Sequence, residues 1–203
     1  MTRMSVTDDQ YGRLWKRLEE VARRVREGTL GFPETMTVLQ EVVEGTVQQT
    51  VGVVRLLVDY ASVYNKPLSQ AIKKCGFDWV EANIADTDFQ VSNRANSTVE
   101  MRVFSTEDLV GKTRSVTSHE VLRILEGMGY RPAEIAELLA FGAEYQDAQR
   151  LHFIIGLGST GGDWNGGRRV LCLGRRDKTR ALLLAEFEDE WSSDCRFLAV
   201  RKS

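Results

Sequence analysis

Charged side chains that could bind a ligand or a metal are concentrated in the C-terminal part of the chain, around Trp191. Paired carboxylates can bind calcium or act as an acid and a base, but this run lacks the regular ligand spacing of an EF-hand loop. We therefore expect a solvated loop that Trp191 anchors to the core, whose charges neutralise those of a preceding basic run; a ligand-binding patch is the alternative. The acidic residues are Glu186, Glu188, Asp189, Glu190 and Asp194, and the basic residues are Arg168, Arg169, Arg175, Arg176, Lys178 and Arg180.

A glycine-rich segment, residues 156–161, matches the GxGxxG pattern of dinucleotide-binding proteins. That pattern binds a pyrophosphate when it lies between a strand and the N-terminus of a helix. Here a predicted strand precedes the glycines, but the residues after them are typical of a loop and another strand. We therefore predict a flexible loop over 158–167 rather than a dinucleotide site.

Histidine and cysteine give little support for a metal site or for nucleophilic catalysis. The chain has two histidines, His119 and His152, without an HxxxH pattern, and three cysteines without a CxxC pattern. Neither histidine has a serine or cysteine nucleophile at a recognisable spacing. We expect no cofactor and no metal, and three reduced thiols at Cys75, Cys172 and Cys195, which is typical of a cytoplasmic protein.

Two predicted helices, 118–128 and 132–145, are joined by Gly-Tyr-Arg-Pro and resemble a helix-turn-helix. A second helix that enters the major groove carries basic residues, because it lies against phosphates. This one carries Glu134, Glu137 and Glu144 instead. The pattern disfavours a nucleic-acid partner.

The overall composition is that of a globular protein with one domain and an appendage, or with two small domains. The 203 residues are 42% hydrophobic and 28% charged, with a net charge of -2. This charge disfavours a strongly basic nucleic-acid binder, and no apolar run approaches the roughly 20 residues of a membrane span. We expect no membrane association, and the N-terminal residues show no signal peptide.

The N-terminal residues 1–48 predict a helical hairpin. Apolar residues recur at steps of three and four over 8–27, which is typical of an amphipathic helix, and Thr7 with Gln10 fits a capping box. The apolar stripe favours packing on the rest of the chain, with a coiled-coil seam as the alternative. A second helix is expected to begin at Pro33.

Residues 49–97 predict a small α/β segment, with a strand at 51–61 and a helix from Pro67 to Lys74. The polar residues 85–98 indicate a boundary. A larger α+β domain follows over 98–203. Its expected elements are a strand at 98–104, the helices 118–128 (opened by a Thr117/Glu120 capping box) and 132–145 (opened by Pro132), and strands at 153–157, 169–174, 181–187 and 195–200. Because the last strand is apolar on both faces, we predict that it is central in its sheet.

The amino-acid sequences of several segments resemble those of an uncharacterised protein family of small-genome candidate-phylum bacteria. The resemblance is carried by 24–30 and 77–80 in the first half, and by 129–134, 137–140, 155–159, 168–170 and 191–202 in the second. It covers most of the chain, and it implies no chemistry, because that family has none assigned.

A second resemblance concerns the C-terminal half. A helix–Gly–Pro–helix unit, short strands, a Trp-bearing loop and a closing Cys-Arg-Phe strand are similar to C-type-lectin-like domains. Residues 129–134 partly match a Gly-Arg-Leu-Pro-Thr-Glu stretch of the formylglycine-generating branch, whose catalytic cysteines and calcium ligands have no counterpart here. The variable proteins of diversity-generating retroelements use this fold to display changeable residues near the C-terminus, which implies display positions within 175–194.

These observations predict an α+β protein whose C-terminal loops bind a protein or a glycan without catalysis. The alternatives are an unrecognised enzyme with its site in the 158–194 loops, or a regulatory protein associated with nucleic acid. The candidate ligand-binding residues are Asp163, Trp164, Asn165, Arg175, Arg176, Asp177, Glu186, Glu188, Asp189, Glu190, Ser192, Ser193 and Asp194.

Overall fold

The computed structural model describes residues 8–33, 35–36, 39, 53–84, 87–111, 115–162, 166–177 and 179–202. The chain divides into two compact units, Met1–Thr50 and Val51–Ser203.

The N-terminal unit contains helix α1 (Asp8–Arg26), which confirms the helix predicted from the apolar stripe. Arg23 bridges Glu20 and Glu27 on its surface, and Gly28 follows in a left-handed conformation (φ 71°). Trp15 and Leu18, on the apolar stripe, are exposed. The predicted capping residue Thr7 and much of the predicted second helix lie outside the described residues, and positions 32–33, 35–36 and 39 are helical.

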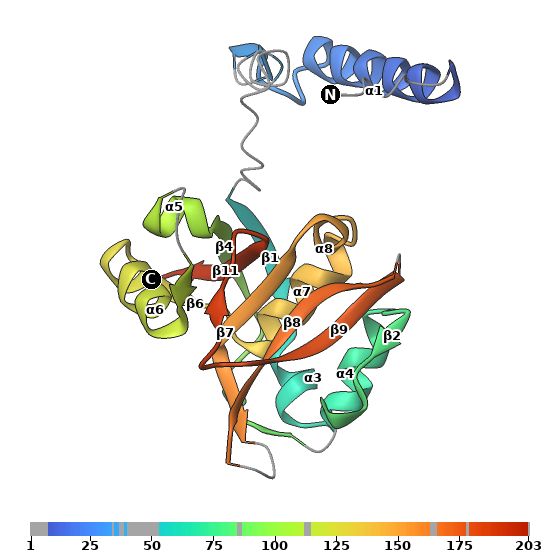
Figure 1. Ribbon diagram of the computed structural model, residues 1–203. Helices are drawn as coiled ribbons and strands as arrows, with labels where there is room; N and C mark the ends of the chain where they lie inside the picture. The colour runs from blue at the N-terminus through green and yellow to red at the C-terminus, as the bar shows by residue number, and fades with distance from the viewer. Residues whose placement is uncertain are drawn as a thin grey trace. The chain divides into compact units, whose positions relative to one another are not determined.

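The second unit is built on a mixed sheet with the strand order β1-β4-β11-β7-β8-β9-β2 (Figure 1). The pairs β11–β7 and β9–β2 are parallel, and the other neighbours in this order are antiparallel. Two short strands join it, β3 on β7 and β6 on β11, while β10 pairs with β5 separately. The bounds are β1 Val54–Val58, β2 Trp79–Val80, β3 Asp88–Phe89, β4 Ser97–Ser105, β5 Val116–Thr117, β6 Tyr130–Pro132, β7 Phe153–Gly162, β8 Arg168–Arg176, β9 Thr179–Glu186, β10 Glu190–Trp191 and β11 Cys195–Arg201.

Helices cover both faces of this sheet. One face packs against α3, α4 and α7, and the other against α5 and α6 (Figure 1). The helical bounds are α3 Tyr60–Tyr64, α4 Leu68–Lys74, η1 Ala82–Ile84, α5 Thr106–Val110, α6 Ser118–Gly127, α7 Ile135–Glu144 and α8 Ala148–Leu151. The protein is therefore α+β, as predicted.

Strand β11 is central, which confirms the prediction made from its two apolar faces. It lies between β4 and β7. Leu198 and Val200 belong to the core under α7, whereas Phe197 and Ala199 belong to the core under α6. All four side chains are buried, so this one strand separates and joins the two cores.

Most of the predicted elements are present, and the capping box of α6 is confirmed. The Thr117 backbone N–H donates to the Glu120 carboxylate (3.1 Å), and the Glu120 N–H donates to the Thr117 hydroxyl (3.3 Å). Several boundaries differ from the prediction. The predicted strand 51–61 ends at Val58, because Asp59 accepts a hydrogen bond from the Ser62 N–H (3.0 Å) and starts α3.

Pro132 does not open the helix that comes after it. It lies in β6, where its register partner in β11 is Ala199, and the helix begins three residues later at Ile135. Because proline has no N–H to donate to a neighbouring strand, it is tolerated at the end of a short strand such as β6.

Strands on both sides of the predicted boundary share one sheet. Strand β1 pairs with β4, and β2 pairs with β9, so residues 51–97 contribute an edge at each end of the sheet. The division at about residue 98 therefore does not coincide with a division into compact units.

The glycine-rich segment is part of a strand, not the predicted flexible loop. Strand β7 runs on to Gly162, and the loop prediction is wrong for 158–162. The Gly158 N–H donates to the Ala133 carbonyl (2.9 Å), and a Cβ at Gly158 would lie 2.6 Å from the Pro132 carbonyl oxygen. The backbone of β7 thus passes directly over the β6–α7 connection, and glycine permits this close approach.

Replacement of Gly158 by alanine should destabilise the protein by about 3 kcal/mol, because the added methyl group meets backbone atoms that cannot rotate away. Gly162→Ala is the matched control on the same strand, since its Cβ would meet no heavy atom within 4 Å. Its effect should stay within about 0.5 kcal/mol. Urea denaturation of both variants measures the difference, and equal stabilities would contradict the packing role assigned to Gly158.

Candidate functional site

The candidate ligand-binding residues that the structure describes are all exposed, but they do not form one cluster. Arg175, Arg176 and Asp177 lie at the turn between β8 and β9. Glu186 and the acidic residues after it lie at the other end of β9, a distance of roughly 25 Å at the usual rise per strand residue. Ser192, Ser193 and Asp194 immediately precede β11, and Asp163, Trp164 and Asn165 lie outside the described residues.

Two ion pairs join the basic and acidic residues at the far end of β9. Arg168 binds the Glu188 carboxylate through Nε (2.9 Å) and Nη2, and Arg169 pairs with Glu186 (2.9 Å). The neutralising contacts predicted between the two runs are thus formed by these two arginines. We call Arg168, Arg169, Glu186 and Glu188 the charged loop surface.

Aromatic rings support this surface from below. The Arg168 guanidinium carbon lies 4.1 Å from the ring centroid of the buried Phe187. The His119 ring meets Phe187 edge-on at 5.3 Å, and its Nε2 lies 3.5 Å from Arg168 Nη2. A cation stacked on an aromatic face is attracted by the ring quadrupole. Arg168 is therefore held both by the Glu188 carboxylate and by the Phe187 ring.

The loop that carries Glu188 is fixed to the start of α6 by one buried hydroxyl. Ser118 Oγ donates to the Phe187 carbonyl (2.5 Å) and accepts from Trp191 Nε1 (2.9 Å). Trp191 is only 5% exposed and lies edge-on to Phe197, in agreement with the prediction that its ring anchors the loop. Ser115 Oγ also donates to the Glu190 carboxylate (2.6 Å).

The arginines at the opposite end of the hairpin make contacts within the fold. Arg175 Nη1 donates to the Arg150 (2.7 Å) and Leu151 (3.2 Å) carbonyls at the end of α8, and Arg176 stacks over Trp79 at 4.5 Å. Arg180, the last of the basic run, is buried rather than solvated.

Arg180 joins three elements of the fold. Its guanidinium donates to the Gly76 (2.9 Å) and Gly142 (2.7 Å) carbonyls near the ends of α4 and α7, and its backbone N–H donates to Asp78 (2.8 Å). A cation is favourable at a helix C-terminus, where carbonyl groups lack partners.

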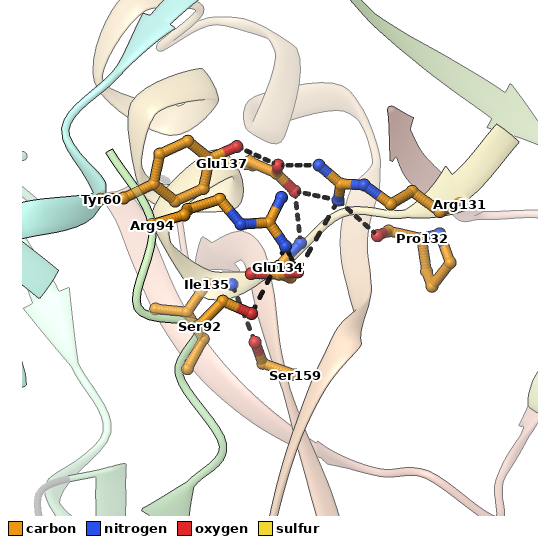
Figure 2. Close-up of polar contacts among 9 residues, drawn as sticks. All are labelled: Tyr60, Ser92, Arg94, Arg131, Pro132, Glu134, Ile135, Glu137 and Ser159. Carbon is orange, nitrogen blue, oxygen red and sulfur yellow. Dashed lines mark hydrogen bonds and ion pairs between the residues drawn. The ribbon is translucent and has the colours of Figure 1, made fainter. Parts of the chain in front are cut away.

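A second polar cluster, centred on Glu137, is not evident from the sequence (Figure 2). The sequence pattern suggests that Glu137 is one acid of an exposed helix, but it is 0% exposed. Its carboxylate accepts from Arg131 through both terminal nitrogens (2.5 and 2.9 Å), from the Tyr60 hydroxyl, and from the Glu134 N–H (2.7 Å). The only signal in the sequence is the three-residue spacing of Glu134 and Glu137, which is that of a capping box.

Neighbouring groups extend this cluster to the surface. Arg94 pairs with Glu134 (2.6 Å) and stacks over Tyr60 at 5.1 Å, and Ser159 Oγ accepts from the Ile135 N–H (3.2 Å) (Figure 2). Burial, and then the hydrogen bond to Glu137, raise the pKa of Tyr60 to about 12. Burial alone lowers the pKa of Arg131, but its hydrogen bonds and attraction to Glu137 outweigh this and raise the pKa overall. Arg131 and Tyr60 therefore both keep the protons that they donate to Glu137, which suits a structural support.

An apolar cavity of about 390 Å³ lies at the β2 edge of the sheet. One wall is a face of α4, with Leu68, Ile72 and Lys73, and the other is formed by Phe77 and by residues of β2 and η1. None of its lining residues is a candidate residue of the sequence analysis, and no motif in the sequence indicates it.

The three thiols are not paired in disulfides; Cys75 and Cys172 are buried and Cys195 is half-buried. Burial raises the pKa of each thiol. Among the residues that the structure describes, no three His, Cys, Asp or Glu side chains form a group that could hold a metal ion. None of the described helices is long and apolar enough to cross a membrane.

Comparison with known proteins gives no relative: no protein-family model, no curated protein and no solved structure matches the chain.

Glu137→Gln should lower the free energy of unfolding by about 3 kcal/mol, because it removes the charged acceptor of both Arg131 terminal nitrogens and leaves only the more distant Glu134 carboxylate (3.9 Å). Glu144→Gln is the control, since Glu144 is an exposed carboxylate of the same helix, and its effect should stay within about 0.5 kcal/mol. Chemical denaturation at neutral pH measures both. A loss below about 1 kcal/mol for Glu137→Gln would show that the cluster is not a structural support.

Trp191→Ala should cost about 3–5 kcal/mol of stability, because it empties a buried aromatic site and leaves Ser118 without its donor. Glu188→Ala and Ser193→Ala should each stay within about 0.5 kcal/mol, since both side chains are exposed. The three variants can be compared by their urea midpoints. A stability nearly unchanged in Trp191→Ala, or a large loss of stability in Glu188→Ala, would contradict the assignment of Trp191 as the anchor and Glu188 as a surface residue.

Proposed function

We propose that residues 51–203 form a non-enzymatic binding module that holds a protein ligand on the charged loop surface. The observation that carries this proposal is the anchor at Ser118. One buried hydroxyl holds both Phe187 and Trp191, so Glu188, between them, projects from a loop whose ends are fixed. A surface held in place before binding loses less conformational entropy when a ligand binds, and it therefore binds more tightly.

The charges of this surface favour a protein over the other partners considered. It holds two arginine–glutamate pairs, with Arg168 stacked on Phe187. A surface with both signs of charge complements the mixed charges of a protein partner, whereas nucleic acid would be repelled by its carboxylates. Arginine is also enriched where protein interfaces concentrate their binding energy.

We also propose that the elements from about residue 98 onward, within the unit Val51–Ser203, are arranged as in a C-type-lectin-like domain, that the chain belongs to the uncharacterised family that it resembles, and that the protein is cytoplasmic. Support for the fold comes from the order of elements: α6, Gly129, the short β6 with Pro132, α7, the strands β7 to β9, the Trp191 loop and the closing β11. Support for the location comes from the three unpaired thiols.

The binding proposal is tested by screening the full chain against a protein array and a glycan array. We expect protein ligands whose affinity falls at least tenfold in Arg168→Glu and on raising the salt concentration. The control is Asp147→Arg, a charge reversal at a highly exposed residue before α8, which should change affinity less than twofold. Ligands that are glycans only, or that bind Arg168→Glu as tightly as wild type, would contradict the proposal.

A further inference from the structure

The cavity at the β2 edge has the size and lining of a small-molecule site. Its volume of about 390 Å³ falls in the range of roughly 300–1,000 Å³ that such sites occupy. Its apolar lining consists of Leu68, Ile72, Phe77, Val80 and Ile84.

Both walls of the cavity are backed by the core. Ile72 in the α4 wall and Ile84 in the opposite wall are buried members of the core under α7, so close packing holds these two walls in place. Val80, by contrast, is 38% exposed although it is a strand residue next to apolar side chains. Covering such a wall with an apolar group would release water from it and would be favourable.

Two charged side chains line the cavity, and they differ in how they are engaged. Glu81 accepts a hydrogen bond from the Leu184 N–H (2.8 Å) and so holds the β9 edge. The Lys73 ammonium group makes no hydrogen bond or ion pair with any of the described residues, although the Lys73 carbonyl accepts from the Gly76 N–H (3.4 Å). The cavity thus offers apolar walls with one available ammonium group beside them.

We infer that this cavity binds the alkyl chain of a medium-chain carboxylate, with the carboxylate on Lys73. Lys73 favours an anionic ligand, because its ammonium group is available to pair with a carboxylate, whereas the Glu81 carboxylate in the same lining already accepts from the Leu184 N–H. A saturated acid of about ten carbons matches the volume and the apolar lining of the cavity. This site is separate from the charged loop surface and does not depend on the function proposed for it.

Calorimetric titration of the full chain with decanoate, decanol and decylamine tests the inference. Decanoate should bind with a dissociation constant of roughly 10 μM to 1 mM, at least fivefold more tightly than decanol, and decylamine should bind weakest. Methyl NMR should show shifts at Leu68, Ile72 and Ile84. Failure of decanoate to bind up to a few millimolar, or equal binding of all three probes, would overturn the inference.

Substitutions separate the roles of the walls and the charge. Ala82→Trp places a large ring at an exposed position of the lining, so it should weaken decanoate at least tenfold without unfolding the core. Lys73→Gln should weaken decanoate about fivefold and leave decanol unchanged. The matched control is Lys66→Gln, an exposed lysine outside the cavity, which should bind decanoate like wild type. Binding that Ala82→Trp does not weaken, or that Lys66→Gln weakens as much as Lys73→Gln, would rule out this site.

Discussion

The buried carboxylate of Glu137 is the constraint on which the arrangement of the second unit depends. A charge in the core is unfavourable unless every lone pair finds a partner, and here the partners come from three separate segments. Tyr60 starts α3, Arg131 lies in β6, and the Glu134 N–H opens α7. Because these donors converge on one group, the cluster ties α3 and β6 to the start of α7.

Once α7 is placed, close packing determines the positions of the strands that come later in the chain. Strand β7 passes over the β6–α7 connection at a distance that only glycine allows, and β11 then lies between β7 and β4 with a core on each face. The second core positions Phe104, Phe197 and Trp191 together. The loop that carries Glu188 is thus anchored by Trp191, whose ring packs against Phe197 of β11. Strand β11 also pairs with β6, whose Arg131 donates to Glu137. Structural support and candidate binding surface belong to opposite faces of one sheet.

Local patterns in the sequence are sufficient to predict features that depend only on interactions between neighbouring residues. The Thr117/Glu120 capping box, the two apolar faces of β11 and the large ring of Trp191 each depend on a few neighbouring residues, and each is predicted correctly. The loop predicted from the glycine pattern is wrong, because the pattern contains no information about which distant residues pack on the glycines. Here residues 132–133 pack on Gly158. Glu137 is missed for the same reason, since its partner Tyr60 is 77 residues away. The candidate residues 175–177 and 186–194 are close in sequence, but they lie at opposite ends of the eight-residue strand β9.

The basic run shows why charge alone does not identify a site. Six basic residues look equivalent in the sequence, yet the described ones have different environments: Arg168 and Arg169 meet carboxylates, Arg175 and Arg180 meet backbone carbonyls, and Arg176 meets a ring. An arginine whose donors are occupied by carbonyl groups of the fold has little left to offer a ligand. Ion pairs at an exposed surface are weak and can be exchanged for those of a partner. The charges suited to recognition are therefore the exposed Arg168–Glu188 pair and the pair between the half-buried Arg169 and the exposed Glu186, whereas the buried Arg180 serves the fold.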